Sequence, residues 1–193
     1  ERLIQALANL PKVCTHLPLP LQAGSNRILE RMNRGYTAEH YLGLVEKLRS
    51  AVPGIALTTD LIVGFPGESE EEFQDTLAMV EKVRFDSAFT FMYSPRRGTP
   101  AASMKGQLET GEKKERLQRL IKLQNQISIE RNRELVGTVQ QVLVEERSGM
   151  TNKGRTTTNK LVFFDSGRDF TGRLVDVKIT RAKTWSLEGE LGD

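Results

Sequence analysis

Along residues 1–135, segments with the hydrophobic pattern of buried strands alternate with segments that have the hydrophobic spacing of helices. Short apolar stretches predict buried strands over residues 12–17, 56–65 and 86–93. Apolar residues at helical spacing predict helices over residues 1–10, 25–32, 37–52 and 111–135, and a further helix that starts after Ser69 and carries Phe73, Leu77 and Val80 on one face. Successive strand–helix units predict an α/β fold with a parallel sheet and helical crossovers. A complete barrel of this kind needs ~250 residues, so we expect its C-terminal half, with units missing before it and apolar faces left exposed.

Two helices carry more specific signals. Ser69 is followed three residues later by Glu72, which predicts a capping box at the start of a helix. The basic helix over 111–135 is expected to bury one apolar stripe, made of Leu117, Leu120, Ile121 and Ile127.

The pattern changes from Gly137. Short alternating segments predict strands over residues 138–145, 160–164, 174–180 and 184–191. Loops rich in Gly, Asn, Ser and Asp separate them, which favours a small antiparallel OB-like β-barrel. We therefore expect two domains, residues 1–135 and 136–193. The alternation also places Trp185 in the barrel core.

Composition indicates a globular chain, and the distribution of its charges is compatible with a polyanionic partner. Of the 193 residues, 38% are hydrophobic and 27% charged, which excludes general disorder. Residues 94–133 carry ten Lys and Arg against four Asp and Glu, and residues 151–183 carry eight against three. Such blocks suit a polyanion, although a solvated surface explains them equally well.

The number of cysteines and the hydropathy of the chain narrow the class of protein further. The single cysteine, Cys14, excludes an internal disulfide and any multi-cysteine metal site within the chain, and is expected to be a small buried hydrophobe. No apolar run approaches the ~20 residues of a membrane span. We expect a cytoplasmic protein with no membrane partner.

Candidate ligand groups follow the strands, because ligands of parallel α/β folds meet the carboxyl ends of strands. Residues 19–26 offer Gln22, Gly24 and Ser25, which suit ribose hydroxyls or a carboxylate, or else form a plain turn and helix cap. Asp60 lies within an otherwise apolar strand and needs either a ligand or a structural partner.

The ends of the second and third strands add flexible and aromatic groups. Gly64 and Gly67 let a ligand approach the backbone closely. Tyr93 and Ser94 can flank a purine ring, and the arginines at 96 and 97 meet either phosphate or solvent. Spacing alone gives a binding cavity of unknown chemistry.

Residues 153–160 indicate nucleic acid. They combine Lys153, Arg155 and Lys160 with Asn159 and three hydroxyls that include Thr156. Arg181 and Lys183 follow on strands that can pair nearby. Cations and hydroxyl donors suit phosphate and 2′-hydroxyl contacts, whereas a polar hairpin is the plainer alternative.

Four segments together resemble the radical-SAM methylthiotransferases. They are residues 16–29 (HLPLPLQAGSNRIL), 32–36 (MNRGY), 59–68 (TDLIVGFPGE) and 85–100 (FDSAFTFMYSPRRGTP). Residues 154–159 (GRTTTN) resemble the TRAM domain with which those enzymes end. The resemblance covers essentially the whole chain and is closest to the branch that methylthiolates carbon 2 of isopentenyl-modified adenosine beside the tRNA anticodon.

The resemblance implies S-adenosylmethionine as cofactor and a set of site residues. The cofactor side of the cavity would be lined by Gln22, Ser25, Asp60, Ile62, Gly64, Pro66, Gly67, Tyr93 and Ser94. RNA would be contacted by Lys153, Arg155, Thr156, Asn159, Lys160, Arg181 and Lys183. The implied partners are a tRNA anticodon stem-loop, a sulfur donor and an electron donor.

The resemblance also implies two 4Fe-4S clusters, whose cysteine ligands are absent from this chain. We therefore expect no catalytic or metal-ligating residue here, and no activity from this chain alone. Pro18 stands where relatives usually carry a histidine, so no role is assigned to a histidine there. Two alternatives stay open: a sister enzyme acting on threonylcarbamoyl-adenosine tRNA or a ribosomal protein, and a non-catalytic RNA-binding module.

Overall fold

The computed structural model describes residues 2–192 and divides into two compact units. The sheet unit comprises residues 18–50 and 57–125. The barrel unit comprises residues 1–17, 51–56 and 126–193. Each unit is described by itself, since the positions of the parts relative to one another are not determined.

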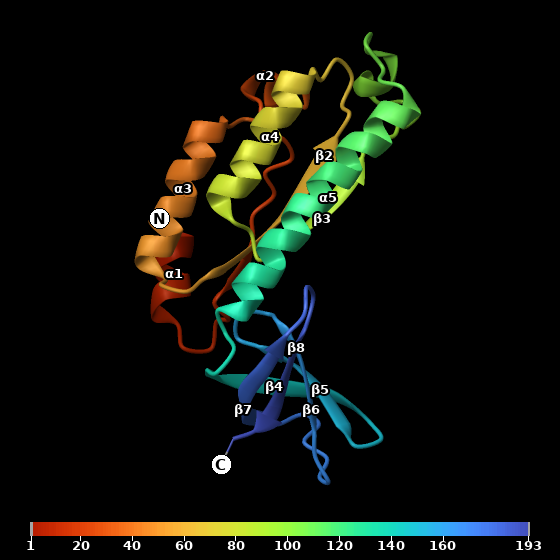
Figure 1. Ribbon diagram of the computed structural model, residues 1–193. Coiled ribbons are helices and arrows are strands. Elements are labelled where there is room, and N and C mark those ends of the chain that lie inside the picture. The colour runs from red at the N-terminus through yellow and green to blue at the C-terminus, as the bar shows by residue number, and fades with distance from the viewer. Residues whose placement is uncertain (1, 193) are drawn as a thin grey trace. The chain divides into compact units, whose positions relative to one another are not determined.

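A three-stranded sheet organises the first two thirds of the chain. Its order is β1 (His16–Pro18), β2 (Ala56–Val63) and β3 (Ser87–Met92), and β2 and β3 pair in parallel. The helices are α1 (Arg2–Asn9), α2 (Asn26–Arg31), α3 (Ala38–Ala51), α4 (Glu70–Val83) and α5 (Thr110–Arg133), with a short 3₁₀ turn, η1 (Pro100–Ser103). In Figure 1, α3 and α4 run beside the strands. The predicted α/β class with a parallel sheet is confirmed.

The two faces of this sheet differ. Along β2, Leu57, Leu61 and Val63 are fully buried, whereas Asp60 and Ile62 point to the opposite face and are half-buried. Asp60 pairs with Phe89, which is 70% exposed, and Ile62 pairs with Phe91. Partners in a parallel ladder share a face. The sheet therefore has one covered face and one open face, as expected of half a barrel.

Local chemistry sets the ends of α4 and the buried side of α5. Ser69 and Glu72 form the predicted capping box. The predicted apolar stripe of α5 is partly wrong, because Ile121 is 38% exposed. Within the sheet unit the buried positions of this helix include Lys113, Arg116 and Gln124, which donate hydrogen bonds to groups of the sheet unit rather than packing as apolar residues.

The barrel unit contains a closed five-stranded barrel, which confirms the predicted architecture. Its order is β4 (Val139–Ser148), β5 (Thr151–Thr156), β6 (Leu161–Asp165), β8 (Leu187–Leu191) and β7 (Leu174–Ala182). One pair, β6 with β8, is parallel, so the barrel is mixed. Its core is built from alternating apolar positions: Val142, Val144, Val162, Phe164, Val177, Ile179 and Leu187. Strand β5 was not predicted from the sequence.

Two further expectations are wrong. Cys14 is exposed rather than buried, because it precedes β1 instead of lying within the strand. Trp185 is 74% exposed, because β8 begins only at Leu187 and Trp185 occupies the turn before it. Among residues 2–192, no helix is long and apolar enough to cross a membrane.

Candidate functional site

A cavity of about 640 Å³ lies at the carboxyl ends of β2 and β3 within the sheet unit. It brings together five of the predicted ligand residues, which come from three separate segments: Gln22, Asp60, Ile62, Tyr93 and Ser94. Its volume falls in the range of small-molecule sites, roughly 300–1,000 Å³. The cavity therefore has the size and the position of a cofactor site.

Gln22 enters the cavity through an unusual backbone conformation. Its φ is 70°, in the left-handed region that non-glycine residues rarely occupy. Its N–H donates to the Asp60 carbonyl at 2.9 Å, and its carbonyl accepts from the Ile62 N–H at 2.9 Å. Its side-chain oxygen accepts from Arg34 at 3.0 Å. The bridge to β2 thus holds a strained residue beside Asp60.

Two polar groups of the cavity lack protein partners. Within the part of the chain that the structure describes, the carboxylate of Asp60 has no hydrogen-bond or ion-pair partner. The buried hydroxyl of Tyr93 likewise has none. Buried polar groups are normally paired, so the Tyr93 hydroxyl is available to a ligand. The Asp60 carboxylate is half-buried on the open face of the sheet and is accessible to a ligand.

The remaining lining supplies apolar surface and positive charge. Phe65 packs edge-on against Tyr93 with ring centroids 5.2 Å apart, and Met104 packs against the same cluster. Three arginines also line the cavity: Arg31, Arg34 and Arg96. Among the lining residues that were not predicted as site residues, only the arginine at 96 could have been suspected from the sequence, because it is a cation just after a strand. Phe65, Met104 and Arg31 look like ordinary core and helix residues in the sequence.

Four predicted site residues lie outside the cavity lining. Ser25 caps α2, accepting from the Ile28 N–H at 3.3 Å, and donates to Glu72 at 2.9 Å. Gly64 (φ 71°) packs under Lys113, where an added Cβ would lie 2.3 Å from the Lys113 Cγ. Pro66 is buried, and the Gly67 N–H donates to the Gly106 carbonyl at 2.6 Å. All four shape the loops around the cavity.

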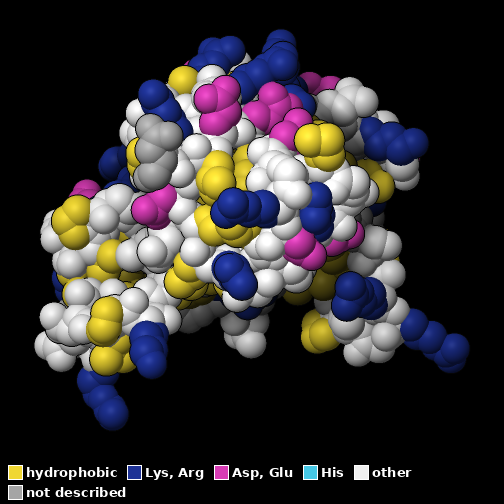
Figure 2. All heavy atoms as spheres, turned by 90° about the horizontal axis from the view of Figure 1, so that it is seen from below, with side chains coloured by type: hydrophobic (Ala, Val, Ile, Leu, Met, Phe, Trp, Pro, Cys, Tyr) yellow, Lys and Arg dark blue, Asp and Glu magenta, His cyan; other side chains and the backbone are white. Residues whose placement is uncertain are grey.

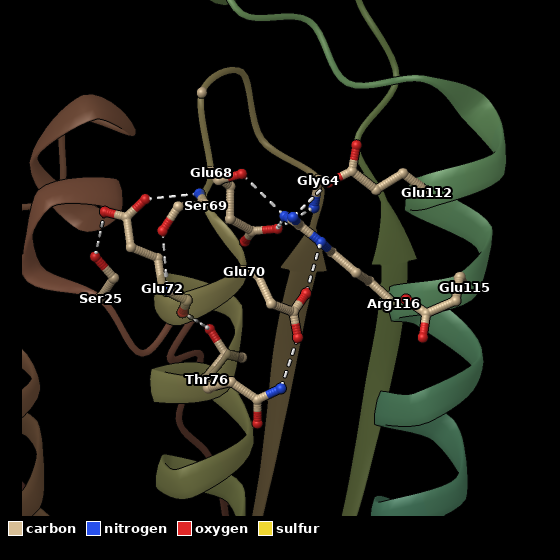
Figure 3. A network of polar contacts seen from close by, with 12 residues as sticks. Ser25, Gly64, Glu68, Ser69, Glu70, Glu72, Thr76, Glu112, Glu115 and Arg116 are labelled. Atoms are coloured by element: carbon tan, nitrogen blue, oxygen red, sulfur yellow. Dashed lines mark hydrogen bonds and ion pairs between the residues drawn. The ribbon is translucent and has the colours of Figure 1, made fainter.

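A buried ion pair supports the loop that follows β2 (Figure 3). The Arg116 guanidinium lies 2.8 Å from the Glu68 carboxylate, and both side chains are at most 3% exposed. The same carboxylate accepts from the Gly64 N–H at 2.7 Å. Burial raises the pKa of Glu68, against the opposing effects of the Gly64 N–H and Arg116. Arg116 also donates to the Glu68 carbonyl at 3.0 Å.

Glu72 joins two loops of the sheet unit (Figure 3). Its carboxylate accepts from Arg27 Nε at 2.7 Å, from the Ser25 hydroxyl at 2.9 Å and from the Ser69 N–H at 2.9 Å. These donors, Arg27 first, lower the pKa of Glu72 from 4.5 to about 2. The Glu72 carboxylate therefore ties the Ser25 loop to the start of α4.

Replacing Glu72 by glutamine is expected to flatten the acid side of the stability profile. Because the folded pKa is depressed, this carboxylate contributes stability that is fully present above about pH 4.5 and lost as pH falls toward 2. Urea unfolding followed across this range measures the effect. Glu81→Gln, an exposed position on the same helix, is the control. Parallel pH profiles for the wild-type and Glu72→Gln proteins would contradict the assignment.

Most of the predicted RNA-binding residues lie on the outer surface of the barrel, and several already face carboxylates. Thr156 is the exception, because it occupies an inward position of β5 and is 4% exposed. Lys153 lies 3.0 Å from Glu146, and Arg155 lies 3.4 Å from Glu145. On the face drawn in Figure 2, basic side chains are interspersed with acidic and hydrophobic ones. The charge offered to a polyanion is therefore smaller than the number of cations suggests.

The remaining predicted residues lie in two hairpins of the same barrel. Asn159 (φ 62°) accepts from Arg155 at 3.2 Å, and the Thr156 hydroxyl accepts from the Lys160 N–H at 3.0 Å. Arg181 and Lys183 both pair with Glu188 in the other hairpin. Among residues 2–192, no group of three or more His, Cys, Asp or Glu side chains is placed to hold a metal ion.

Two segments of the chain match two different family profiles. The profile of the radical SAM superfamily matches residues 1–80, and that of the TRAM domain matches residues 133–191. Residues 1–80 are therefore similar to the radical SAM superfamily, and residues 133–191 are similar to the TRAM domain.

Three curated relatives are each named tRNA-2-methylthio-N(6)-dimethylallyladenosine synthase. The chain is 60% identical to that of Moorella thermoacetica and 57% identical to that of Syntrophomonas wolfei, over 99% of this chain and 44% of each relative. It is 54% identical to that of Thermoanaerobacter sp. strain X514, over 99% of this chain and 41% of the relative. The chain thus spans less than half the length of these relatives.

Proposed function

We propose that this chain is the cofactor-orienting and RNA-holding part of a tRNA methylthiotransferase acting on carbon 2 of isopentenyl-modified adenosine beside the anticodon. The observation that carries the proposal is the convergence of Gln22, Asp60 and Tyr93 on one cavity at the strand ends. The relatives' shared name and the TRAM match support the substrate class. We place the division between the two parts at 135/136 and the protein in the cytoplasm.

The cavity residues fit S-adenosylmethionine by chemistry. The unpaired Asp60 carboxylate and the Gln22 amide suit ribose hydroxyls, and Ile62 with the Phe65 and Tyr93 rings suits a purine. Arg31, whose Nε is buried without a hydrogen-bond partner among the described residues, suits the carboxylate of the amino-acid moiety. When bound, S-adenosylmethionine supplies the radical chemistry of the superfamily. The residues of this chain bind it, orient it and exclude water.

The chain holds one cysteine, so it cannot supply the cysteine sets of two 4Fe-4S clusters. We infer that clusters, sulfur donor and electron donor act with the full-length enzyme, and that the chain alone is inactive. The barrel residues from Lys153 to Lys160, with Arg181 and Lys183, would hold the anticodon stem-loop through phosphates.

Nucleoside mass spectrometry of tRNA tests the proposed function. Cells lacking the full-length gene should lose the methylthio group and accumulate isopentenyl-adenosine, and the wild-type gene should restore it. Asp60→Asn should weaken cofactor binding roughly 10- to 100-fold and lower the restored level, because a charge-assisted hydrogen bond is lost. Asp75→Asn, an exposed position on α4, should restore fully.

The same experiment separates the alternatives. Loss of methylthio groups from threonylcarbamoyl-adenosine, or from a ribosomal protein, would indicate a sister enzyme. Unchanged tRNA and ribosomal protein, together with RNA binding by the chain, would indicate a non-catalytic module.

A further inference from the structure

Trp185 stands apart from the other aromatic residues of the barrel unit. Phe164 is 2% exposed in the barrel core, whereas Trp185 is 74% exposed. It lies in a tight turn between β7 and β8, closed by the Lys183 N–H donating to the Ser186 carbonyl at 2.8 Å. An indole ring presented at the tip of a short turn has its face available for stacking.

One buried side chain fixes this turn. Asn132, 5% exposed, donates from Nδ2 to the Lys183 carbonyl at 2.8 Å and to the Thr184 carbonyl at 3.1 Å. Its Oδ1 accepts from Lys160 Nζ at 2.9 Å. Asn132 therefore joins the turn that carries Trp185 to the β5–β6 hairpin that carries Lys160. A turn fixed in this way loses little conformational freedom when it binds.

The charges around the turn favour a nucleic acid over an apolar protein surface. Arg181 and Lys183 precede Trp185 closely in the sequence and share the carboxylate of Glu188, and Lys160 adds a cation through Asn132. Because carboxylates offset many of the barrel's cations, phosphate contacts alone give modest affinity. Stacking of a base on an aromatic ring adds a contribution that salt bridges do not supply.

We propose that Trp185 is the base-stacking residue of this TRAM domain and receives one unpaired base of the bound RNA, while Lys160 and Lys183 contact the adjacent backbone. This inference rests on the proposed function and adds a residue and a ligand class to it. The expected ligand is a single-stranded loop rather than a continuous duplex, since bases within a duplex offer no free face.

Trp185 is the only tryptophan of the chain, so its fluorescence reports on the contact directly. The 193-residue chain is titrated with a labelled anticodon stem-loop RNA and with a fully paired duplex, and anisotropy measures binding independently. We expect the stem-loop to quench the fluorescence and the duplex to leave it unchanged. Trp185→Ala should weaken stem-loop binding roughly 5- to 100-fold and leave duplex binding unchanged.

Two variants control the experiment. Trp185→Phe keeps a stacking ring and should retain most of the stem-loop affinity. Met150→Ala removes another exposed apolar side chain, 65% exposed at the β4–β5 turn, and should have no effect. RNA binding with unquenched fluorescence and an unaffected Trp185→Ala variant would overturn the inference and leave the proposed function standing. Failure of the wild-type chain to bind either RNA would count against the proposed RNA-holding role itself.

Discussion

Replacing Arg116 by alanine is expected to lower the free energy of unfolding of the sheet unit by about 3–5 kcal/mol. The substitution leaves the Glu68 carboxylate buried, with the Gly64 N–H still donating to it but without its cation. An uncompensated buried charge costs far more than the loss of an exposed ion pair. Urea unfolding followed by circular dichroism at 222 nm measures the change, because it reports on the helices.

The pH dependence identifies the cause. Burial already raises the pKa of Glu68, and loss of Arg116 should raise it further. The Arg116→Ala variant should therefore recover stability relative to wild type as pH falls through the raised pKa, since protonation removes the buried charge. A destabilisation that stays constant with pH would point to lost packing instead.

Two comparisons complete this test. Arg119→Ala lies on the same helix, and its ion pairs with Glu70 and Glu115 are exposed, so it should cost no more than about 1 kcal/mol. The double variant Glu68→Gln, Arg116→Met removes both charges and should lose much less than Arg116→Ala alone. Equal losses in Arg116→Ala and Arg119→Ala would contradict the importance of burial.

The ion pair also shows where sequence patterns fail. An apolar stripe was predicted for α5, yet Arg116 and Gln124 are buried there. Their burial is possible because they donate hydrogen bonds to Glu68 and to the Phe85 carbonyl, which lie 48 and 39 residues away in the sequence. Helical periodicity reports only which residues share a face. It carries no information about a hydrogen-bonding partner in a distant loop.

The cavity could be predicted from the sequence, whereas strand β5 and the position of Trp185 could not. Gln22 and Tyr93 follow β1 and β3, and Asp60 lies in the second half of β2. The carboxyl ends of parallel strands meet at one edge, so the convergence of these residues follows from topology. Strand β5 has Asn152, Gly154 and Thr156 at its inward positions, which hides the alternation of a strand. Trp185 matched an alternation that the turn before Leu187 interrupts.

Replacing Gly24 by alanine is expected to lower the free energy of unfolding by about 1–3 kcal/mol, through a clash with the backbone. An added Cβ would lie 2.4 Å from the Asp75 carbonyl oxygen and 2.5 Å from the Thr76 Cα. Backbone atoms within a helix cannot rotate away, so the loop itself must move from α4. That movement would also break the hydrogen bond from the Gly24 N–H to the Thr76 hydroxyl, 2.9 Å long.

The same displacement should reach the cofactor cavity. Gln22 lies two residues earlier and is held to β2 by two backbone hydrogen bonds, so a shift of the loop must strain either that bridge or α4. Gly43→Ala provides an opposite control, because an added Cβ on α3 meets nothing within 4 Å. It should raise stability by about 0.5–1 kcal/mol, as alanine favours the helix over glycine. Urea unfolding of the two variants should therefore give changes of opposite sign, and a shared sign would show that the approach of the Gly24 loop to α4 is not tight.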